Sequence, residues 1–350
     1  MTGKYPPKHR LRYEAARPSW KCLLSALIIF MGLFLGAPSE AAPLRDGEHR
    51  AVLNGIKHWY RVAASKRRTT PLIIVHGGPG GSVYTFERTL GPRLERFSTI
   101  VYYDQRGSGR SDAPADATNS SIEALVQDLD ALRQSLGADR INLLGFSFGG
   151  QLALEYAVRH PDRVERMILQ AAPNGDLRRL AAIQTWGFAS VLKGDAAKKL
   201  EALQSEPILS PSKRMEEVWS LADADAVDRF LFHDPKHAAR NRTLWEQSGH
   251  RNSGLMLKAL FADTAPASTM RFKLRQLNVP ALIIVGRYDR NVGLDMERDL
   301  ASALPDSRLV IMPNSAHFPD LEEPELYACE VERFLTQRQN RCSAGRAISA

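Results

Sequence analysis

A serine, a carboxylate and an imidazole occur along this chain in the order Ser147, Asp289, His317, a set of side chains that can perform nucleophilic catalysis. Ser147 lies in a Gly-x-Ser-x-Gly pattern over residues 145–149. His317 would accept the serine proton, and Asp289 would fix the imidazole tautomer and stabilise its charged form. We therefore predict that these three residues form a catalytic triad.

The segments on either side of Ser147 have the patterns of a strand and a helix. Residues 141–144 are mostly apolar, as in a buried strand, and residues 151–158 have helical apolar spacing that stops before Pro161. The glycine pattern alone also fits an ordinary strand-to-helix turn. Because strand, turn and helix are the context of a nucleophile elbow, this context favours the catalytic interpretation.

A second glycine-rich loop follows the apolar segment 71–75 and begins at His76. Glycines leave backbone N–H groups accessible to a ligand. We expect the amides of Gly77 and Gly78, together with the amide of Phe148 after the nucleophile, to form an oxyanion hole. The His76 side chain is interpreted as structural, holding the loop through hydrogen bonds.

The elements that must position these residues alternate between strands and helices. A hairpin is expected around Asn54-Gly55, within residues 48–63. The remaining strand-like segments are 71–75, 98–103, 141–144, 167–171, 279–285 and 307–312, with helices at 121–136, 151–158 and 326–335. This alternation predicts an α/β fold with a mostly parallel sheet flanked by helices. Asp289 and His317 follow the last two strands, and groups at the carboxyl ends of parallel strands converge on one crevice.

The middle of the chain interrupts the alternation. Residues 176–278 contain several helical stretches and no convincing strand. This segment is far longer than a normal connection between two sheet strands. We predict a helical cap, or lid, over residues 176–278. The hydrolase core would then comprise residues 42–175 and 279–342.

The N-terminus has the three parts of a secretory signal peptide. Residues 1–21 carry six Lys or Arg and one acid, an apolar run covers residues 22–37, and small residues end at Ala42. Cleavage after Ala41 or Ala42 predicts a secreted or periplasmic protein with residues 1–41 removed. An uncleaved membrane anchor is the alternative, and it would be the protein's one contact with a membrane.

Charge and cysteine content limit the partners. Removing residues 1–41 takes away six basic and two acidic residues, which lowers the net charge from +8 to +4, so nucleic-acid binding is not indicated. Cys329 and Cys342 remain, either as a disulfide or as two thiols. Because no Cys/His cluster has metal-ligand spacing, neither a metal nor a cofactor is expected.

Three motifs resemble those of the proline iminopeptidases and related serine aminopeptidases of the α/β-hydrolase superfamily. They are His76-Gly77-Gly78-Pro79-Gly80, Asp104-Gln105-Arg106-Gly107-Ser108-Gly109-Arg110-Ser111 and Gly286-Arg287-Tyr288-Asp289. The resemblance covers about residues 50–336 and implies an α/β-hydrolase fold with an inserted helical lid. It also implies a lid glutamate that binds the substrate's free amino group, for which Glu246 is the candidate. Phe146 and Phe148 depart from the Gly-Gly-Ser-Trp-Gly form that the family usually has around its serine.

These observations lead to one main functional hypothesis and several alternatives. The main hypothesis is an exported serine hydrolase that removes an N-terminal residue from a short peptide through an acyl-enzyme. The alternative within the fold is an esterase or lactonase acting on a small apolar ester, which needs no acid to pair with an amine. A non-catalytic binding module and a membrane-anchored interaction protein are the hypotheses outside enzyme function.

Overall fold

A computed structural model describes residues 44–115, 120–205, 209–250, 267–338, 342 and 348–349. All of them lie in one compact unit, Pro43–Ala350. The predicted signal peptide, residues 1–41, lies outside the described residues. Among the helices that are described, none is both long enough and apolar enough to cross a membrane.

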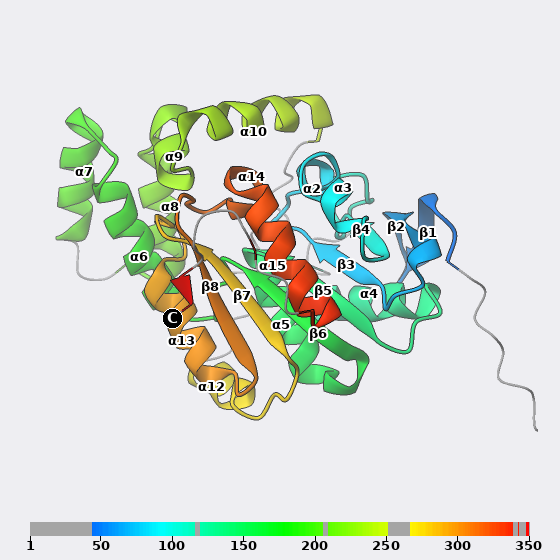
Figure 1. Cartoon of the computed structure of the whole chain (residues 1–350). Coiled ribbons are helices and arrows are strands. Elements are labelled where there is room, and N and C mark those ends of the chain that lie inside the picture. The colour runs from blue at the N-terminus through cyan, green and yellow to red at the C-terminus, as the bar shows by residue number, and fades with distance from the viewer. Residues whose placement is uncertain are drawn as a thin grey trace, which may run out of the picture. The chain divides into compact units, whose positions relative to one another are not determined.

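The centre of the fold is a sheet of nine strands in the order β1-β2-β4-β3-β5-β6-β7-β8-β9 (Figure 1). The strands are β1 (Gly47–Leu53), β2 (Ile56–Ala63), β3 (Leu72–Val75), β4 (Ile100–Tyr103), β5 (Ile141–Phe146), β6 (Val164–Gln170), β7 (Ala281–Gly286), β8 (Ser307–Met312) and β9 (Ile348–Ser349). The six strands from β4 to β8 in this order pair in parallel, and the pairings at both edges are antiparallel. The predicted mostly parallel sheet is confirmed.

The predicted hairpin at the start of the sheet is also confirmed. β1 and β2 pair in antiparallel register, with Leu53 opposite Ile56. The two residues between them, Asn54 and Gly55, both have positive φ, at 47° and 80°. Asn and Gly adopt this conformation more readily than other residues, which explains why the pair specifies the turn.

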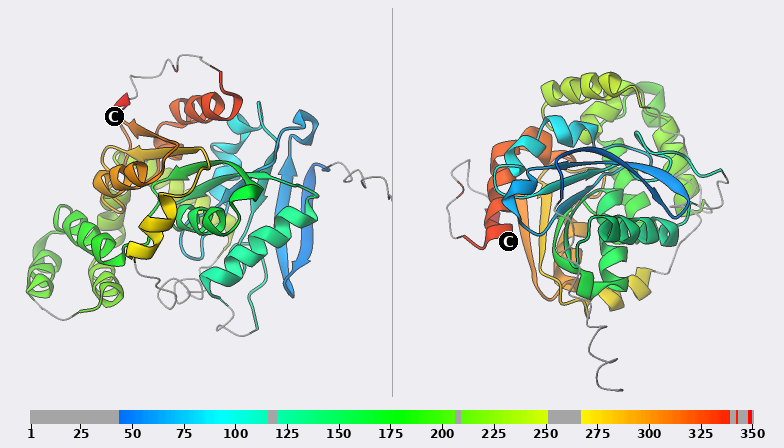
Figure 2. Two further views of the ribbon diagram at one scale, coloured as in Figure 1. Left: turned by 90° about the horizontal axis from the view of Figure 1, so that it is seen from below. Right: turned by 90° about the vertical axis from the view of Figure 1, so that its right-hand side faces the viewer.

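Helices cover both faces of the sheet (Figure 2). They are α2 (Tyr84–Arg88), α3 (Gly91–Leu94), α4 (Ile122–Ser135), α5 (Phe148–Arg159), α13 (Leu294–Ala303), α14 (Pro319–Glu322) and α15 (Pro324–Thr336). One core cluster joins a sheet face to α4, α5 and α13, and a second joins the other face to α2, α3 and α15. The central strands β3, β5 and β7 are buried along their whole length, as their continuous apolar runs predict.

The segment predicted to be a lid begins with five described helices after β6. They are α6 (Leu177–Ala189), α7 (Gly194–Gln204), α8 (Pro211–Ser220), α9 (Ala224–Leu231) and α10 (Pro235–Ser248). α6 to α9 share an apolar cluster of their own, around Phe188, Val218 and Phe230. The cap was predicted to extend to residue 278, but α12 (Ala267–Leu274) places Met270 and Leu274 in the core of the sheet. The part of the insertion that α12 forms therefore packs with the core.

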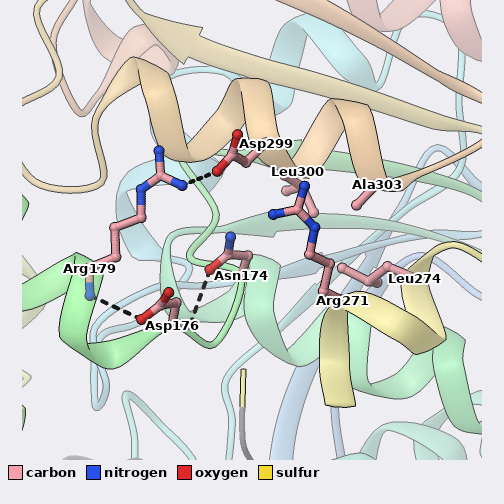
Figure 3. A pocket seen from close by; sticks show the side chains of 8 residues that line it. All are labelled: Asn174, Asp176, Arg179, Arg271, Leu274, Asp299, Leu300 and Ala303. Atoms are coloured by element: carbon pink, nitrogen blue, oxygen red, sulfur yellow. Dashed lines mark hydrogen bonds and ion pairs between the residues drawn. The ribbon is translucent and has the colours of Figure 1, made fainter. Parts of the chain in front are cut away.

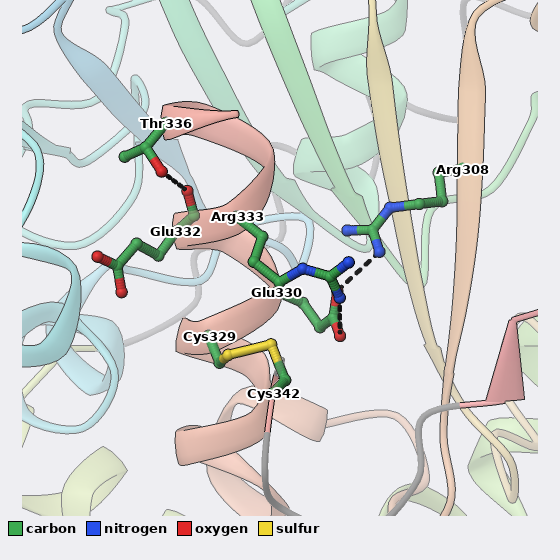
Figure 4. Close-up of a disulfide and its surroundings, with 7 residues drawn as sticks. All are labelled: Arg308, Cys329, Glu330, Glu332, Arg333, Thr336 and Cys342. Carbon is green, nitrogen blue, oxygen red and sulfur yellow. Dashed lines mark hydrogen bonds and ion pairs between the residues drawn. A yellow bond between two sulfur atoms is a disulfide. The ribbon is translucent and has the colours of Figure 1, made fainter. Parts of the chain in front are cut away.

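A disulfide joins Cys329 of α15 to Cys342 in the C-terminal tail (Figure 4). The sequence left this pairing open, and the structure contains the bond. Beside it on α15, Glu330 pairs with Arg308 of β8 at 2.8 Å, which ties the helix to the sheet. The disulfide adds a covalent link between the last long helix and the segment that leads to β9.

Candidate active site

Ser147 stands on a strained turn between β5 and α5. Its φ and ψ are 52° and −122°, a region that residues with a Cβ atom rarely adopt. A Cβ atom on Gly145 would press on the backbone of Gly149 and Gly150, and one on Gly149 would press on the carbonyl oxygen of Val75. Both glycines of the pattern are therefore needed for strand and helix to approach, as the elbow interpretation requires.

The glycine-rich loop after β3 lies against Ser147. A Cβ atom on Gly77 would come within 3.1 Å of the Ser147 Cβ atom. Within the described residues, the backbone N–H groups of Gly77, Gly78 and Phe148 have no hydrogen-bond acceptor. Phe148 is also the first residue of α5, where the helix dipole favours negative charge. The role of these three amides as an oxyanion hole stays a prediction.

His76 holds this loop through its ring. Nδ1 lies 2.8 Å from the carbonyl oxygen of Gly77, and Nε2 accepts the backbone N–H of Gln105 at 3.1 Å. The side chain of Gln105 in turn donates to the carbonyl oxygen of His76 at 2.8 Å. Burial lowers the pKa of His76, so the ring is neutral at physiological pH and Nε2 can accept. These contacts fit the structural interpretation of this histidine.

The loop after β4 supports the same region through buried ion pairs. Asp104 accepts the backbone N–H of Val83 at 2.9 Å and pairs with Arg110 at 2.8 Å. Arg106 pairs with Asp128 of α4 at 2.5 Å, and both side chains are almost fully buried. The motif over residues 104–111 therefore holds the glycine-rich loop and the segment after it in place.

Asp289 and His317 meet at the carboxyl ends of β7 and β8, as their positions in the sequence predict. Nδ1 of His317 donates to Oδ2 of Asp289 at 3.1 Å. The other oxygen of Asp289 accepts the backbone N–H groups of Asn291 and Val292 at 2.8 and 3.1 Å. Burial raises the pKa of Asp289, but the imidazole and the two amides outweigh burial and hold that pKa below its ordinary value. Asp289 is therefore ionised at neutral pH, and it can stabilise an imidazolium.

An aromatic wall flanks the imidazole. The Phe146 ring lies 5.1 Å from the His317 ring and 5.0 Å from the Phe318 ring, and Phe318 stacks on Phe232 at 4.7 Å. Phe146, one of the departures from the family pattern, thus gives the site an apolar surface. Ser147 is next to this wall, but within the described residues no hydrogen bond joins its hydroxyl to His317. Nε2 of His317 lies 3.1 Å from the side-chain nitrogen of Asn291 instead.

The histidine loop is fastened to the lid. The backbone N–H of His317 donates to the carbonyl oxygen of Leu231 at 2.9 Å. Glu322 accepts the backbone N–H groups of Ala316, His233 and Asp234 at 2.7, 2.8 and 3.0 Å, which bridges the histidine loop and the start of α10. These hydrogen bonds connect the inserted helices with the loop that carries His317.

The structure does not connect the glutamates of the inserted helices with the predicted catalytic residues. Glu246 lies on the last turn of α10 with an exposed side chain, and the described residues offer it no contact with Ser147, Asp289 or His317. Glu216 and Glu217 are paired with Lys213 on the surface of α8. Glu246 stays a prediction.

A small pocket of about 130 Å³ lies among α6, α12 and α13 (Figure 3). Arg179 spans it by pairing with Asp299, while Arg271 and Leu274 line the side that α12 contributes. None of its lining residues is a predicted site residue.

Two further buried acids, Glu297 and Asp320, lie close to Asp289 and His317. Glu297 of α13 is fully buried, and burial, reinforced by the Asp289 carboxylate, raises its pKa well above the ordinary value. Asp320 follows His317 too closely in the sequence to orient it from a separate strand. It accepts from the side chain of Gln170 at 2.5 Å, and His317 bonds to Asp289 instead.

Asp320 should make folding stability depend on pH. Burial raises its pKa to about 6, although the bond from Gln170 opposes this. In an unfolded chain the pKa of an aspartate is about 4. The protonated Asp320 therefore contributes its full stabilisation below about pH 4, and this stabilisation is lost as the pH rises through about 6. The expected loss between pH 4.5 and pH 7.5 is about 2 kcal/mol of unfolding free energy, out of about 3 kcal/mol for the whole transition. When the unfolding free energy is measured with denaturant at pH 4.5 and at pH 7.5, Asp320→Asn should not show this loss.

The exposed Asp195 supplies the control for this experiment. Asp195→Asn should follow the wild-type pH dependence, because its side chain is 91% exposed. Equal pH slopes for Asp320→Asn and the wild-type protein would show that Asp320 does not titrate in this range.

Comparison with known proteins places the chain in a family. The alpha/beta hydrolase fold family matches residues 70–324, and the chain belongs to it. A proline iminopeptidase of Saccharolobus solfataricus is 26% identical over 301 residues, covering 81% of this chain and 90% of the relative. The 2-hydroxy-6-oxononadienedioate/2-hydroxy-6-oxononatrienedioate hydrolase 1 of Dechloromonas aromatica is 27% identical, covering 76% and 86%.

A solved structure is also similar over most of this chain. The proline iminopeptidase-related protein from Thermus thermophilus superposes with a TM-score of 0.67 at 25% identity, covering 84% of this chain and 98% of that one. The resemblance to proline iminopeptidase-like members of the superfamily is thus confirmed, and the relatives indicate a hydrolase. The names of these relatives refer to different substrates, so the comparison does not decide whether this protein acts on peptides or on esters.

Proposed function

We propose that the protein is a serine hydrolase of the proline iminopeptidase type, with Ser147 as nucleophile, His317 as base and Asp289 as the orienting acid. The observation that carries this proposal is the buried Asp289–His317 pair at the strand ends, next to a serine on a strained elbow. A strained backbone is retained at few places other than functional sites.

The reaction would proceed through an acyl-enzyme. The Ser147 oxygen attacks the substrate carbonyl carbon while its proton passes to Nε2 of His317. The amides of Gly77, Gly78 and Phe148 hold the resulting oxyanion. Collapse of this intermediate breaks the bond to the leaving amine, which takes the proton from His317. Water then attacks the acyl-enzyme with His317 again as base, and releases the acid and the serine.

Peptide specificity is the finer part of the proposal. It is supported by the proline iminopeptidase relatives and by the position of Glu246 four residues before His250, whose ring meets Tyr84 of α2 at 6.1 Å. α10 contacts α2, which directly follows the glycine-rich loop, and this contact supports a place for Glu246 near that loop.

Glu246→Gln tests this amine anchor. We expect KM for a proline arylamide to rise by about 10-fold or more, because hydrogen bonds to charged groups contribute about 1.5–3 kcal/mol. KM for a short-chain aryl ester, which has no amine, should stay unchanged. Glu216→Gln, on the exposed face of α8, is the matched control. An effect no larger than that of the control would reject Glu246 as the amine anchor, and turnover of the ester alone would reject the peptidase assignment.

The aromatic wall supports a second candidate, an esterase or lactonase. Phe146 and Phe318 offer an apolar surface beside His317, which suits the acyl chain of a small ester. The same pair of substrates decides between the two candidates, because an esterase would turn over the aryl ester and leave the arylamide intact.

We also propose that residues 1–41 export the protein. The Cys329–Cys342 disulfide supports this, because disulfides persist mainly in oxidising compartments. N-terminal sequencing of the protein recovered from outside the cytoplasm should begin at Ala42 or Pro43. Recovery of the uncut chain in the membrane fraction would favour the anchor.

A further inference from the structure

A directional chain of hydrogen bonds runs from the lid to the imidazole of His317. Nε1 of Trp219, on α8, donates to Oε1 of Gln184, on α6, at 2.8 Å. Nε2 of Gln184 donates to Oδ1 of Asn291 at 2.7 Å. Nδ2 of Asn291 lies 3.1 Å from Nε2 of His317. We call Trp219, Gln184 and Asn291 the amide chain.

The two ends of this chain fix the orientation of every member. The indole N–H of Trp219 can only donate, and the carboxylate of Asp289 can only accept. Gln184 must therefore turn its oxygen to Trp219 and its nitrogen to Asn291, and Asn291 must turn its nitrogen to His317. His317 then accepts at Nε2 and donates from Nδ1 to Asp289.

This arrangement has a consequence for the nucleophile. A neutral imidazole has a single accepting nitrogen, and the Ser147 hydroxyl needs that nitrogen to lose its proton. In this structure Asn291 occupies it. Gln184 is only 7% exposed, so water competes poorly for the bond that holds Asn291 in place.

We propose that Asn291, held by Gln184 and Trp219 of the lid, is a positioning residue that occupies the accepting nitrogen of His317 and restrains acylation of Ser147 until it is displaced. The restraint links the state of the lid to the reactivity of the serine. The inference rests on the proposed role of Ser147 as nucleophile.

The rate of covalent labelling by a fluorophosphonate tests this restraint without a known substrate. Asn291→Leu keeps the size of the side chain but removes the donor, and labelling should become about 2- to 10-fold faster, as expected for loss of one neutral hydrogen bond. Gln184→Met, which frees Asn291 from the lid, should also accelerate labelling, by a smaller factor. Thr185→Val is the control, because Thr185 is buried on the same helix and its hydroxyl bonds only to Ala181.

Gln184→Glu reverses the polarity of the amide chain and should have the opposite effect. The introduced carboxylate can only accept, so Asn291 must turn its nitrogen to position 184 and its oxygen to Nε2 of His317. A carbonyl oxygen at Nε2 favours a proton there, which removes the base, and labelling should fall about 10-fold or more below the wild-type rate.

The outcomes separate the two proposals. Faster labelling of Asn291→Leu together with slower labelling of Gln184→Glu supports the restraint. Labelling of Asn291→Leu at or below the wild-type rate, or equal rates for Gln184→Glu and Gln184→Met, overturns it. If the wild-type protein is labelled no faster than Ser147→Ala, the proposed serine chemistry fails instead.

Discussion

Ser147→Ala is expected to lower kcat by about 10⁴-fold or more with any substrate that the protein turns over. The hydroxyl is the proposed attacking group, and removal of the nucleophile from a serine hydrolase triad leaves only the contribution of the oxyanion donors and of binding. The steady-state rate of purified protein on an arylamide or aryl ester checks this, with thermal unfolding to establish that the variant folds.

Ser220→Ala is the matched control for this substitution. Ser220 ends α8 on the exposed side of the lid, where its hydroxyl bonds to the carbonyl oxygen of Glu217. It should keep the wild-type rate. Retention of more than about a tenth of kcat by Ser147→Ala would place the nucleophile elsewhere.

The second large effect is expected from Asp289→Asn, which should reduce kcat by about 10⁴-fold. An amide facing Nδ1 of His317 would donate where the carboxylate accepts, and it would hold the imidazole in the wrong tautomer. The backbone N–H groups of Asn291 and Val292 could still bond to the amide oxygen, so the loop should keep its shape.

Asp320→Asn distinguishes the orienting acid from the other carboxyl near His317. Asp320 bonds to Gln170 and lies outside the Asp289–His317 contact, so its substitution should change kcat by less than about 10-fold at pH 7. A larger loss for Asp320→Asn than for Asp289→Asn would exchange the two assignments.

Much of the fold could be predicted because its signals are local. Continuous apolar runs such as residues 71–75 mark buried parallel strands, and the Asn54-Gly55 turn specifies the first hairpin. The elbow follows from glycines that lie two residues on either side of Ser147. α13 has an amphipathic sequence with no distinctive cap, and it was not anticipated.

The parts of the site that could not be predicted depend on contacts between distant segments. Gln184 and Asn291 are separated by 107 positions, and nothing in either local sequence indicates that they meet. The burial of Glu297 likewise depends on how α13 packs on the sheet. Glu246 was predicted from the family resemblance alone. The sequence of a helix does not show which of its faces points toward the active site.

The most direct test of the proposed acyl-enzyme is to trap it. The protein is mixed with a short-chain aryl ester, quenched in acid within milliseconds, and digested for mass spectrometry. The account predicts one acyl group on the peptide that contains Ser147, and none on that peptide from Ser147→Ala. Turnover of the ester with no adduct on Ser147, or with the adduct on another residue, would contradict it.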